Sequence, residues 1–489
     1  MIMKTRIKTA SIIAGMLLVS SGLFAQNIQT QYFLNIPQSA QLNPAYRPDA
    51  NLFIGIPVLS GIYSGMSNNL FNVSKLIQPM PGADSLITIL HPDYDRDSFF
   101  RSIGNKAFIS TEVEVPIVSV GFSAADVWWV DLGMAVKGTT RSRLPADLFT
   151  LALEGNEGFI GSFADLSGTG LHAQAYLETH VGLSRNITNK LRVGGRLKLM
   201  QGLLSASIIA DKLELQVHDD YSQSLVTDVA LKLSGPFDVT LNDDGFIDDI
   251  LFGDDIAFGD VSPSFKNFGL GLDLGAEYML MDNLQLSASI IDLGFVRWGR
   301  ESYTFRATND FTFDGFDISE MIEGDKELDQ IVEEFGDSLL TTFDFVESEE
   351  GYSTGLPTKL YLAASYRPVD FVSLGALSRT TVGMGVRESL TLSATLFAGN
   401  VLSTSLSYTM TNRSYNNFGF GLGVRGGSFQ FYAVVDQIPA TWVKFTGDEG
   451  NDNVVVPNRL DYLNMRFGIN LLFGRYQTKK RADTPMLVE

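Results

Sequence analysis

The 489-residue sequence contains no cysteine. This excludes disulfides, thiolate metal sites and cysteine nucleophiles. Histidine is nearly as rare, with four in the chain, so a multi-histidine metal site is not expected. No metal and no other cofactor is predicted. Lys and Arg (36) are outnumbered by Asp and Glu (56), giving a net charge of −20. Because binding to nucleic acid requires clustered cations, nucleic acid is not an expected partner.

Long apolar runs are missing beyond the N-terminus. A basic stretch with Lys4, Arg6 and Lys8 precedes the apolar residues 12–23, and Ala25 is placed for cleavage, which predicts a signal peptide over residues 1–25. After it we find no run of about 18 uncharged apolar residues, so no transmembrane helix is expected. An exported chain of this kind can be periplasmic, secreted, or a barrel of the outer membrane.

Residues 268–298, "FGLGLDLGAEYMLMDNLQLSASIIDLGFVRW", alternate apolar and polar side chains on both sides of a short turn. The alternation exceeds the 5–6 residues typical of a soluble strand and approaches the 9–11 that cross a bilayer. Tight turns on one side and long connections on the other predict an all-β transmembrane antiparallel barrel of a Gram-negative outer membrane. Tyr278 and Trp298, near strand ends, are expected in the interfacial aromatic belts. The alternative is a large secreted β-sandwich or propeller.

After the predicted signal peptide, the chain divides into a short N-terminal stretch and a long region of strands. Residues 26–50 lack alternation and contain Pro37, Pro44 and Pro48, so we interpret them as a hatch lying in or beneath the barrel. The alternative is a disordered leader. Residues 51–474 are predicted to form the barrel and residues 475–489 a periplasmic tail. Glycines on the inner face, such as Gly275, leave room for material in the lumen.

Two acidic insertions, residues 219–260 and 314–350, are expected in large extracellular loops, and the second is predicted to be dispensable for folding. Around Gly245 the sequence "LNDDGFIDDI" partly resembles a calcium loop. However, Thr240 stands where such a loop has its first Asp, and Leu251 where it has its bidentate Glu. An acidic turn is therefore the preferred interpretation.

The hairpin over residues 171–201 carries the candidate site. If Leu197 and every second residue before and after it face lipid, the polar residues of both strands face the lumen. These residues are His172, Tyr176, Glu178, His180, Arg192, Arg196 and Lys198. Pairing about Ile187 places Glu178 opposite Arg196. On this assignment Leu197→Arg is costly, whereas Arg196→Glu is expected to leave folding largely intact. The lumen charges either guide polar or anionic head groups or, as we prefer, pair to fix the wall and anchor the hatch.

Several segments resemble one protein family. "LNPAYRPDANLFIGIP", "LRVGGRLKLMQG", "LSASIIDLGFVRW" and "MRFGINLLFG" are similar to an uncharacterised outer-membrane barrel family of Bacteroidota, related to FadL-like fatty-acid transporters and to PorV and PorP proteins. The resemblance implies about 14 strands and an N-terminal hatch, in which Asn43, Pro44 and Ala45 match the start of those barrels. It supplies no catalytic residues.

Three functions are compatible with these features. The leading hypothesis is a non-enzymatic barrel that passes small hydrophobic molecules past its hatch. The alternative is a structural or type IX secretion-associated subunit that docks lipoproteins or secreted proteins through its loops. No nucleophile motif or phosphate loop is present, so an enzyme is the least favoured. Outer-membrane lipids and lipopolysaccharide are expected partners in each barrel hypothesis.

Overall fold

The computed structural model describes residues 28–474, except 71–72, 81–85, 126, 220–221, 242–246, 253–265, 300–301, 309, 314–345, 349–350, 384, 412–413, 440–441, 447–452 and 459–461. Most of the insertion 314–350 and the centre of the calcium-like sequence lie outside the described residues. Most of the insertion 219–260 is described and forms strands, the longest over residues 223–234, so it is not the simple loop that the sequence predicts. Within the described ranges, no helix is both long and apolar enough to span a membrane.

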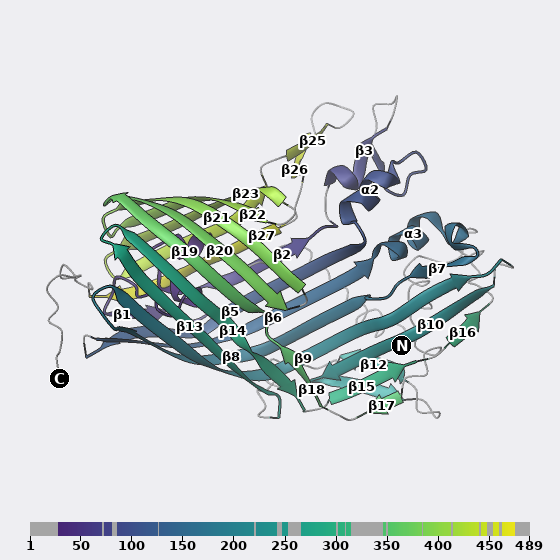
Figure 1. Ribbon diagram of the computed structural model, residues 1–489, viewed down its shortest axis with the longest axis horizontal. Helices are drawn as coiled ribbons and strands as arrows, with labels where there is room; N and C mark the ends of the chain where they lie inside the picture. The colour runs from purple at the N-terminus through teal and green to yellow at the C-terminus, as the bar shows by residue number, and fades with distance from the viewer. Residues whose placement is uncertain are drawn as a thin grey trace, which may run out of the picture.

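Fourteen wall strands close an antiparallel barrel, which confirms the predicted fold class (Figure 1). The first wall strand is split into β1 and β2, and both pieces pair with β5 on one side and β27 on the other. The sheet therefore closes on itself, as a lipid environment requires. The wall strands are β1 (Leu52–Gly55) with β2 (Ile62–Asn68), β5 (Lys106–Ala124), β6 (Trp128–Pro145), β8 (Gly170–Asn186), β9 (Leu191–Val217), β13 (Phe268–Met281), β14 (Leu284–Trp298), β19 (Thr358–Val369), β20 (Val372–Gly383), β21 (Gly385–Ala398), β22 (Leu402–Thr411), β23 (Ser414–Gly426), β24 (Phe429–Pro439) and β27 (Tyr462–Phe473).

Side chains alternate between the two faces of this wall. On β22, Leu406 is 60% exposed on the outside, whereas the neighbouring Ser405 and Ser407 are buried on the inside. The outward face is apolar and the inward face is dominated by Ser, Thr, Gly and charged residues. This is the distribution expected when one face contacts hydrocarbon and the other a polar lumen.

The two ends of the barrel differ. Short turns join β5 to β6, β8 to β9, β13 to β14, β19 to β20, β21 to β22 and β23 to β24, at the end where the chain enters β1 and leaves β27. We call this the turn end. The opposite connections are long except at two places: β21 begins at Gly385 directly after β20 ends at Gly383, and β23 begins at Ser414 after β22 ends at Thr411. The prediction that all opposite connections are long is therefore wrong at these two.

One side of the wall extends far past the other (Figure 1). β5, β6, β8 and β9 have 19, 18, 17 and 27 residues, whereas β19–β24 have 10 to 14. Further strands widen this extension: β7 (Ser162–Asp165), β10 (Gln223–Ser234), β15 (Ser302–Ala307), β16 (Asp310–Phe313), β17 (Val346–Ser348) and β18 (Tyr352–Gly355).

We call the end opposite the turn end the loop end, and small elements lie at or beyond it. α2 (Arg96–Ile103) packs near α3 (Ala146–Glu154), with the rings of Phe99 and Phe149 5.8 Å apart. Among the described residues, three separate hairpin sheets are formed by β3 (Ile77–Pro79) with β4 (Leu86–Thr88), β11 (Phe237–Leu241) with β12 (Ile247–Phe252), and β25 (Trp442–Thr446) with β26 (Asn453–Pro457).

The aromatic belt prediction is wrong for Trp298. Tyr278 is 41% exposed on the outer face, but Trp298 is completely buried and its indole N–H donates to Thr354 Oγ1 at 3.0 Å. The cause is a bulge in β14, where Ile291 and Asp292 together stand opposite Asp273. One extra residue reverses the alternation for the rest of the strand, so Trp298 turns inward.

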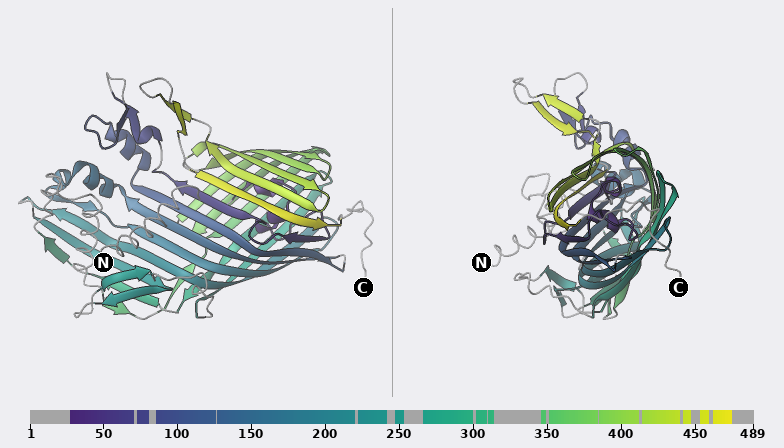
Figure 2. Two further views of the ribbon diagram at one scale, coloured as in Figure 1. Left: turned by 180° about the vertical axis from the view of Figure 1, so that it is seen from behind. Right: turned by 90° about the vertical axis from the view of Figure 1, so that its left-hand side faces the viewer.

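Residues 28–50, which we call the N-terminal segment, lie inside the barrel (Figure 2). They form two short 3-10 helices, η1 (Thr30–Phe33) and η2 (Pro37–Gln41). Ile28, Leu34 and Ile36 pack with Tyr63, Tyr432 and Val434 of the wall. Phe33 and Leu42 pack with wall residues on β14, β19 and β20. The segment is thus part of the core of the molecule.

Candidate functional site

The polar residues predicted on β8 and β9 all face the barrel interior. Glu178, Arg196 and Lys198 are each less than 5% exposed, whereas Leu197, between the last two, is 69% exposed on the outer face. Tyr176 and Arg192 are also buried, and His172 and His180 are partly buried. The pleat therefore places neighbouring residues in opposite environments.

The predicted pairing of this hairpin is wrong by four residues, because the turn is centred two residues later than predicted. Glu178 lies opposite Met200, His180 opposite Lys198, and Gly182 opposite Arg196. The turn is centred nearer Asn189 than Ile187, because β9 begins only at Leu191. Glu178 and Arg196 are therefore not cross-strand neighbours.

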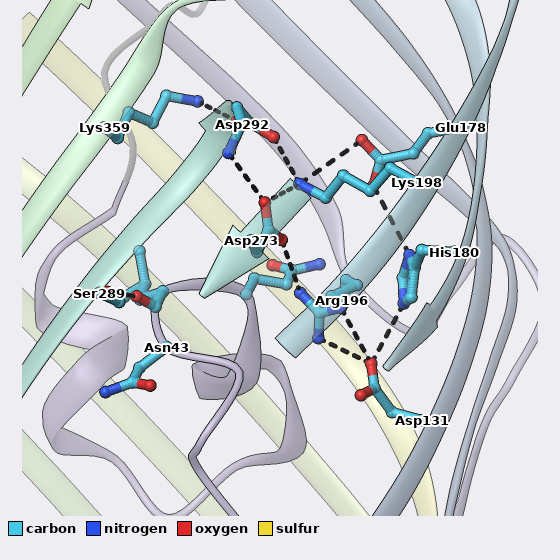
Figure 3. Close-up of polar contacts among 12 residues, drawn as sticks. Asn43, Asp131, Glu178, His180, Arg196, Lys198, Asp273, Ser289, Asp292 and Lys359 are labelled. Atoms are coloured by element: carbon cyan, nitrogen blue, oxygen red, sulfur yellow. Dashed lines mark hydrogen bonds and ion pairs between the residues drawn. The ribbon is translucent and has the colours of Figure 1, made fainter. Parts of the chain in front are cut away.

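Instead, Arg196 and Lys198 share carboxylates from other strands (Figure 3). Arg196 Nη2 donates to Asp131 Oδ2 at 2.7 Å, and its Nη1 lies 3.4 Å from Asp273 Oδ2. Lys198 Nζ lies 2.8 Å from Asp273 Oδ1 and 2.5 Å from Asp292 Oδ1. Asp273 is completely buried and links the two cations.

The chain of charges continues on both sides. Lys359 Nζ on β19 lies 2.9 Å from Asp292 Oδ2, and Lys137 Nζ on β6 lies 2.7 Å from Glu178 Oε2. His180 stands between two carboxylates, with Nε2 3.3 Å from Asp131 and Nδ1 3.6 Å from Glu178. The lumen network, as we call this set, consists of Asp131, Lys137, Glu178, His180, Arg196, Lys198, Asp273, Asp292 and Lys359.

The charges of the lumen network balance. Four carboxylates face two lysines from β6 and β19 and two cations from β9, and each has an ion-pair partner. Buried charges are tolerated when paired in this way, and removing one partner is costly. The arrangement favours a role in fixing the wall over capture of a free anion, because every cation is already neutralised.

Sequence reasoning missed five members of the lumen network: Asp131, Lys137, Asp273, Asp292 and Lys359. Asp273 was detectable, since it lies on the polar face of the alternating stretch 268–278. Asp292 was not, because it reaches the lumen only through the bulge in β14, where it has a positive φ of 61°. Its N–H donates to Asp273 Oδ1 at 2.8 Å, which holds the bulge in place.

The remaining predicted residues lie elsewhere on the inner wall. Arg192 pairs with Glu277 at 3.1 Å, closer to the turn end. Tyr176 packs with Met200 and Trp298. His172 lies opposite Arg141 and Ser207, toward the loop end. These three belong to separate surroundings and do not join the lumen network.

Asn43, Pro44 and Ala45 lie against two glycines of the wall. A Cβ atom at Gly275 would lie 2.1 Å from Asn43 Oδ1, and one at Gly194 would lie 2.2 Å from the carbonyl oxygen of Pro44. Asn43 Oδ1 accepts the N–H of Ala45 at 2.9 Å, and its Nδ2 donates to the carbonyl of Ala276. Glycine is required at both wall positions for the motif to approach so closely.

Hydrogen bonds hold the N-terminal segment to strands all around the barrel. Thr30 Oγ1 is 2.5 Å from Ser407 Oγ on β22, and its N–H donates to Asp436 on β24 at 3.1 Å. Gln38 exchanges two amide hydrogen bonds with Asn470 on β27, at 2.8 and 3.0 Å. Ser289 Oγ on β14 donates to the carbonyl of Leu42 at 2.5 Å. The N-terminal segment therefore fills this part of the lumen and is joined to the wall by polar contacts.

Cavities lie next to the segment. One of about 840 Å³ opens at the turn end and is lined by Tyr32, Phe33 and Leu34 of the segment together with wall residues. A smaller one of about 70 Å³ separates Gln31 and Leu42 from the lumen network. Among the described residues, no group of three or more His, Asp or Glu is arranged to hold a metal.

Comparison with known proteins gives one family and several solved barrels. A family model described as "Family of unknown function (DUF5723)" matches residues 44–436. No curated protein sequence matches the chain. Solved structures that it resembles include the toluene transporter TbuX of Ralstonia pickettii, with 8% identity over 93% of this chain and 98% of that one at a TM-score of 0.40. A FadL homologue from Pseudomonas aeruginosa has 12% identity over 92% and 99%, also at 0.40. The toluene transporter TodX of Pseudomonas putida has 10% identity over 91% and 95%, at 0.36.

Proposed function

The chain belongs to DUF5723, a family of unknown function, and we propose that it is a non-enzymatic outer-membrane barrel that passes small hydrophobic molecules past its N-terminal segment. In this proposal the segment acts as a hatch. The apolar outer face would contact outer-membrane lipids and, in the outer leaflet, lipopolysaccharide.

The observation that carries the proposal is how the lumen is closed. The N-terminal segment occupies it through hydrogen bonds to β14, β22, β24 and β27 rather than by continuing the wall. Each such bond contributes only about 0.5–1.5 kcal/mol net. The segment is also held by apolar packing against the wall. In this proposal it leaves its site while the barrel remains closed, since the wall ladders do not depend on it.

The proposed class of transported molecule is based on the side chains of the N-terminal segment that line the turn-end cavity. Tyr32, Phe33 and Leu34 line the cavity of about 840 Å³ at the turn end, together with Phe371 and Phe397 of the wall. The volume lies within the range of about 300–1,000 Å³ that is typical of small-molecule sites, and the lining is mixed, because polar residues such as Arg192 and Glu277 also border the cavity. A hydrophobic molecule moving past the displaced segment would meet these side chains.

The test locks the hatch in a chain that has no cysteine of its own. Thr30→Cys with Ser407→Cys replaces two hydroxyls that lie 2.5 Å apart, a separation compatible with disulfide geometry. The matched control, Thr395→Cys with Ser405→Cys, replaces hydroxyls 2.9 Å apart on β21 and β22 and joins two wall strands only. Uptake of radiolabelled toluene would be measured in intact Gram-negative cells with no hydrocarbon channel of their own.

We expect toluene uptake by the Thr30–Ser407 pair to fall to the level of empty cells after oxidation and to recover after reduction. The control pair should transport equally in both states. Equal uptake by the oxidised and reduced Thr30–Ser407 pair would rule out the hatch. No uptake above empty cells by the wild-type chain, for toluene or for oleate, would rule out passage of hydrophobic molecules.

A second function, docking of lipoproteins or secreted proteins, is favoured by one observation. Leu86 and Leu90, on and after β4, and Trp442 and Val455, on the β25–β26 hairpin, are 49–73% exposed on elements beyond the loop end. Exposed apolar residues on projecting hairpins are suited to partner contacts. Co-purification in mild detergent, comparing wild type with Trp442→Ser/Val455→Ser, tests this: loss of a stoichiometric partner in the variant supports docking, and identical partners in both contradict it.

A further inference from the structure

A row of hydrogen-bond donors crosses the inner wall between the lumen network and the loop end. Its members pair strand by strand on β2, β5, β6, β8 and β9. We call them the donor row: Ser67, Ser110, Arg141, His172 and Ser207. The row lies on the loop side of the lumen network, because Arg141 follows Lys137 on β6, which runs toward the loop end. No member is a carboxylate, so the row differs from the network below it.

Arg387 of β21 reaches across the lumen to this row. Its Nη1 donates to Ser67 Oγ at 3.5 Å, and its guanidinium carbon lies 4.9 Å from the centre of the Phe108 ring on β5. In the wall, β22, β23, β24 and β27 stand between β21 and β2. The contact is therefore made through the interior and not between neighbouring strands, which places the Arg387 guanidinium beside the donor row.

Positive charge exceeds negative charge at this level. Among the described residues, Arg387 forms no ion pair, and Glu112 acts on it only from a longer distance. Arg141 Nη2 lies 3.6 Å from Glu112 Oε1, and Arg379 adds a third guanidinium nearby. Asp436, which also acts on Arg379, is already bound by backbone N–H groups of the N-terminal segment. A partly buried cation without a partner is costly, so this level of the lumen favours a bound anion.

A buried hydroxyl directly below the row lacks a hydrogen-bond partner. Thr139 lies next to Arg141 on the inner face of β6, and its Oγ1 is buried with no partner among the described residues. Buried hydroxyl groups are normally hydrogen-bonded. A ligand with acceptor oxygens, bound against Arg141, would supply the missing partner.

The side chains around the donor row suit a hydrophilic ligand. Neither the row nor the residues directly below it on β5, β6, β8 and β9 include an aliphatic side chain; those below are Glu112, Thr139, Gln174 and Ser205. Toluene or an acyl chain gains little from such a surface, because its gain depends on the apolar area that is buried together. Guanidinium groups and hydroxyls, in contrast, bind phosphate, sulfate and carboxylate oxygens through charge-assisted hydrogen bonds.

We propose that Arg387 and the donor row, with Arg141 as its second guanidinium, bind the oxyanion group of a small hydrophilic solute. Arg141, His172 and Arg387 are partly exposed, so a solute that enters from the loop end can reach them. The bound oxyanion accepts hydrogen bonds from both guanidiniums and balances their charge. The ligand differs in class from the hydrophobic cargo proposed above, and the site is therefore tested without any transport measurement.

Equilibrium dialysis of the full-length protein in detergent against radiolabelled inorganic phosphate tests the site. We expect saturable binding that weakens about tenfold or more in Arg387→Gln and in Arg141→Gln, because each change removes charge-assisted hydrogen bonds. The matched control is Arg297→Gln, exposed on the outer face of β14, which should bind as the wild type does. Heat-modifiable gel mobility verifies that each variant is a folded barrel. No saturable binding by the wild type, or undiminished binding by folded Arg387→Gln, would overturn the proposal.

Chemical modification of the wild type supplies a test that needs no variant. Phenylglyoxal reacts with accessible arginine side chains, and peptide mass spectrometry measures the rate at each site. We expect phosphate to slow modification of Arg141 and Arg387 several-fold, because a bound oxyanion covers both guanidiniums, and to leave Arg297 unchanged. Equal rates at Arg387 with and without phosphate would contradict binding at this site.

Competition for labelled phosphate distinguishes hydrophilic oxyanions from amphiphilic ones and from simple counterions. Gluconate and hexanoate form a matched pair, since both are carboxylates with the same number of carbon atoms and only gluconate is hydroxylated. We expect sulfate and gluconate to displace phosphate, and hexanoate to displace it no better than gluconate. Stronger displacement by hexanoate would show a site for amphiphiles, and displacement by an equal concentration of chloride would show a nonspecific positive potential. Either result would overturn the proposal.

Discussion

Asp131 and Arg196 form an ion pair of 2.7 Å across a strand that belongs to neither of them. Asp131 is on β6 and Arg196 on β9, and Gly182 of β8 lies directly opposite both. A Cβ at Gly182 would lie 1.9 Å from Asp131 Oδ1. The pair therefore exists only because the intervening residue has no side chain.

Gly182→Ala is accordingly expected to disrupt this pair and destabilise the barrel. The added methyl occupies the position of the Asp131 carboxylate, and displacing one partner of a buried pair costs about 3–5 kcal/mol. Gly195→Ala is the control, since its new Cβ would have its nearest neighbours at 3.6 Å. Urea titration of folded barrel in detergent or vesicles, followed by heat-modifiable mobility, would compare the two, and equal midpoints would contradict the expectation.

Leu197→Arg and Arg196→Glu should both impair assembly, for different reasons. Arginine at the lipid-facing position 197 costs about 2–4 kcal/mol near the bilayer midplane. Glutamate at position 196 would face Asp131 and Asp273 in place of their cation. The expectation that Arg196→Glu is tolerated is thus reversed by the observed partners.

Two further substitutions, added to each of these variants, separate the two reasons for impaired assembly. Asp131→Asn with Asp273→Asn should partly rescue Arg196→Glu, because it removes the repelling charges, and should not rescue Leu197→Arg. The amount of heat-modifiable barrel in the membrane fraction is the measurement. Rescue of Leu197→Arg instead would mean that position 197 faces the lumen.

Gly275→Val should expel the N-terminal segment while leaving the barrel closed. The new side chain would occupy the position of the Asn43 amide, whereas the backbone pairing of β13 with β9 and β14 needs no glycine there. Oxidation of the Thr30–Ser407 cysteine pair reports docking of the segment, and its yield should fall sharply. Gly138→Ala, whose Cβ would meet no atom within 4 Å, is the control and should leave the yield unchanged.

Deleting residues 318–345 should leave barrel assembly intact. These residues fall between β16, which ends at Phe313, and β17, which begins at Val346, and lie entirely outside the described residues. Loop length contributes little to closure entropy. Failure of the shortened chain to reach the membrane as heat-modifiable barrel would show that the insertion is needed for folding.

The sequence by itself determined the barrel and the two faces of most strands. A side-chain period of two leaves no choice once Leu197 faces outward, so Arg196 and Lys198 had to face inward. The same logic places Asp273 on the inner face, although the sequence analysis did not single it out, and inner-face glycines such as Gly275 indicated material in the lumen. These features depend only on neighbours along one strand.

Tertiary structure decided which charges meet. The partners of Arg196 depend on the turn between β8 and β9, whose geometry fixes the register, and on a third strand that pairing rules for one hairpin do not include. The position of Asp292 in the lumen depends on a bulge in β14. The same bulge reverses the alternation of the following residues, so Trp298 also faces inward. The contact of Asn43 with the wall depends on the register between β9 and β13, which pairs Gly194 with Gly275. That register follows from the stagger of the strands in the closed barrel. Alternation is a local property of each strand, whereas register, bulges and stagger are set by closing all fourteen wall strands together.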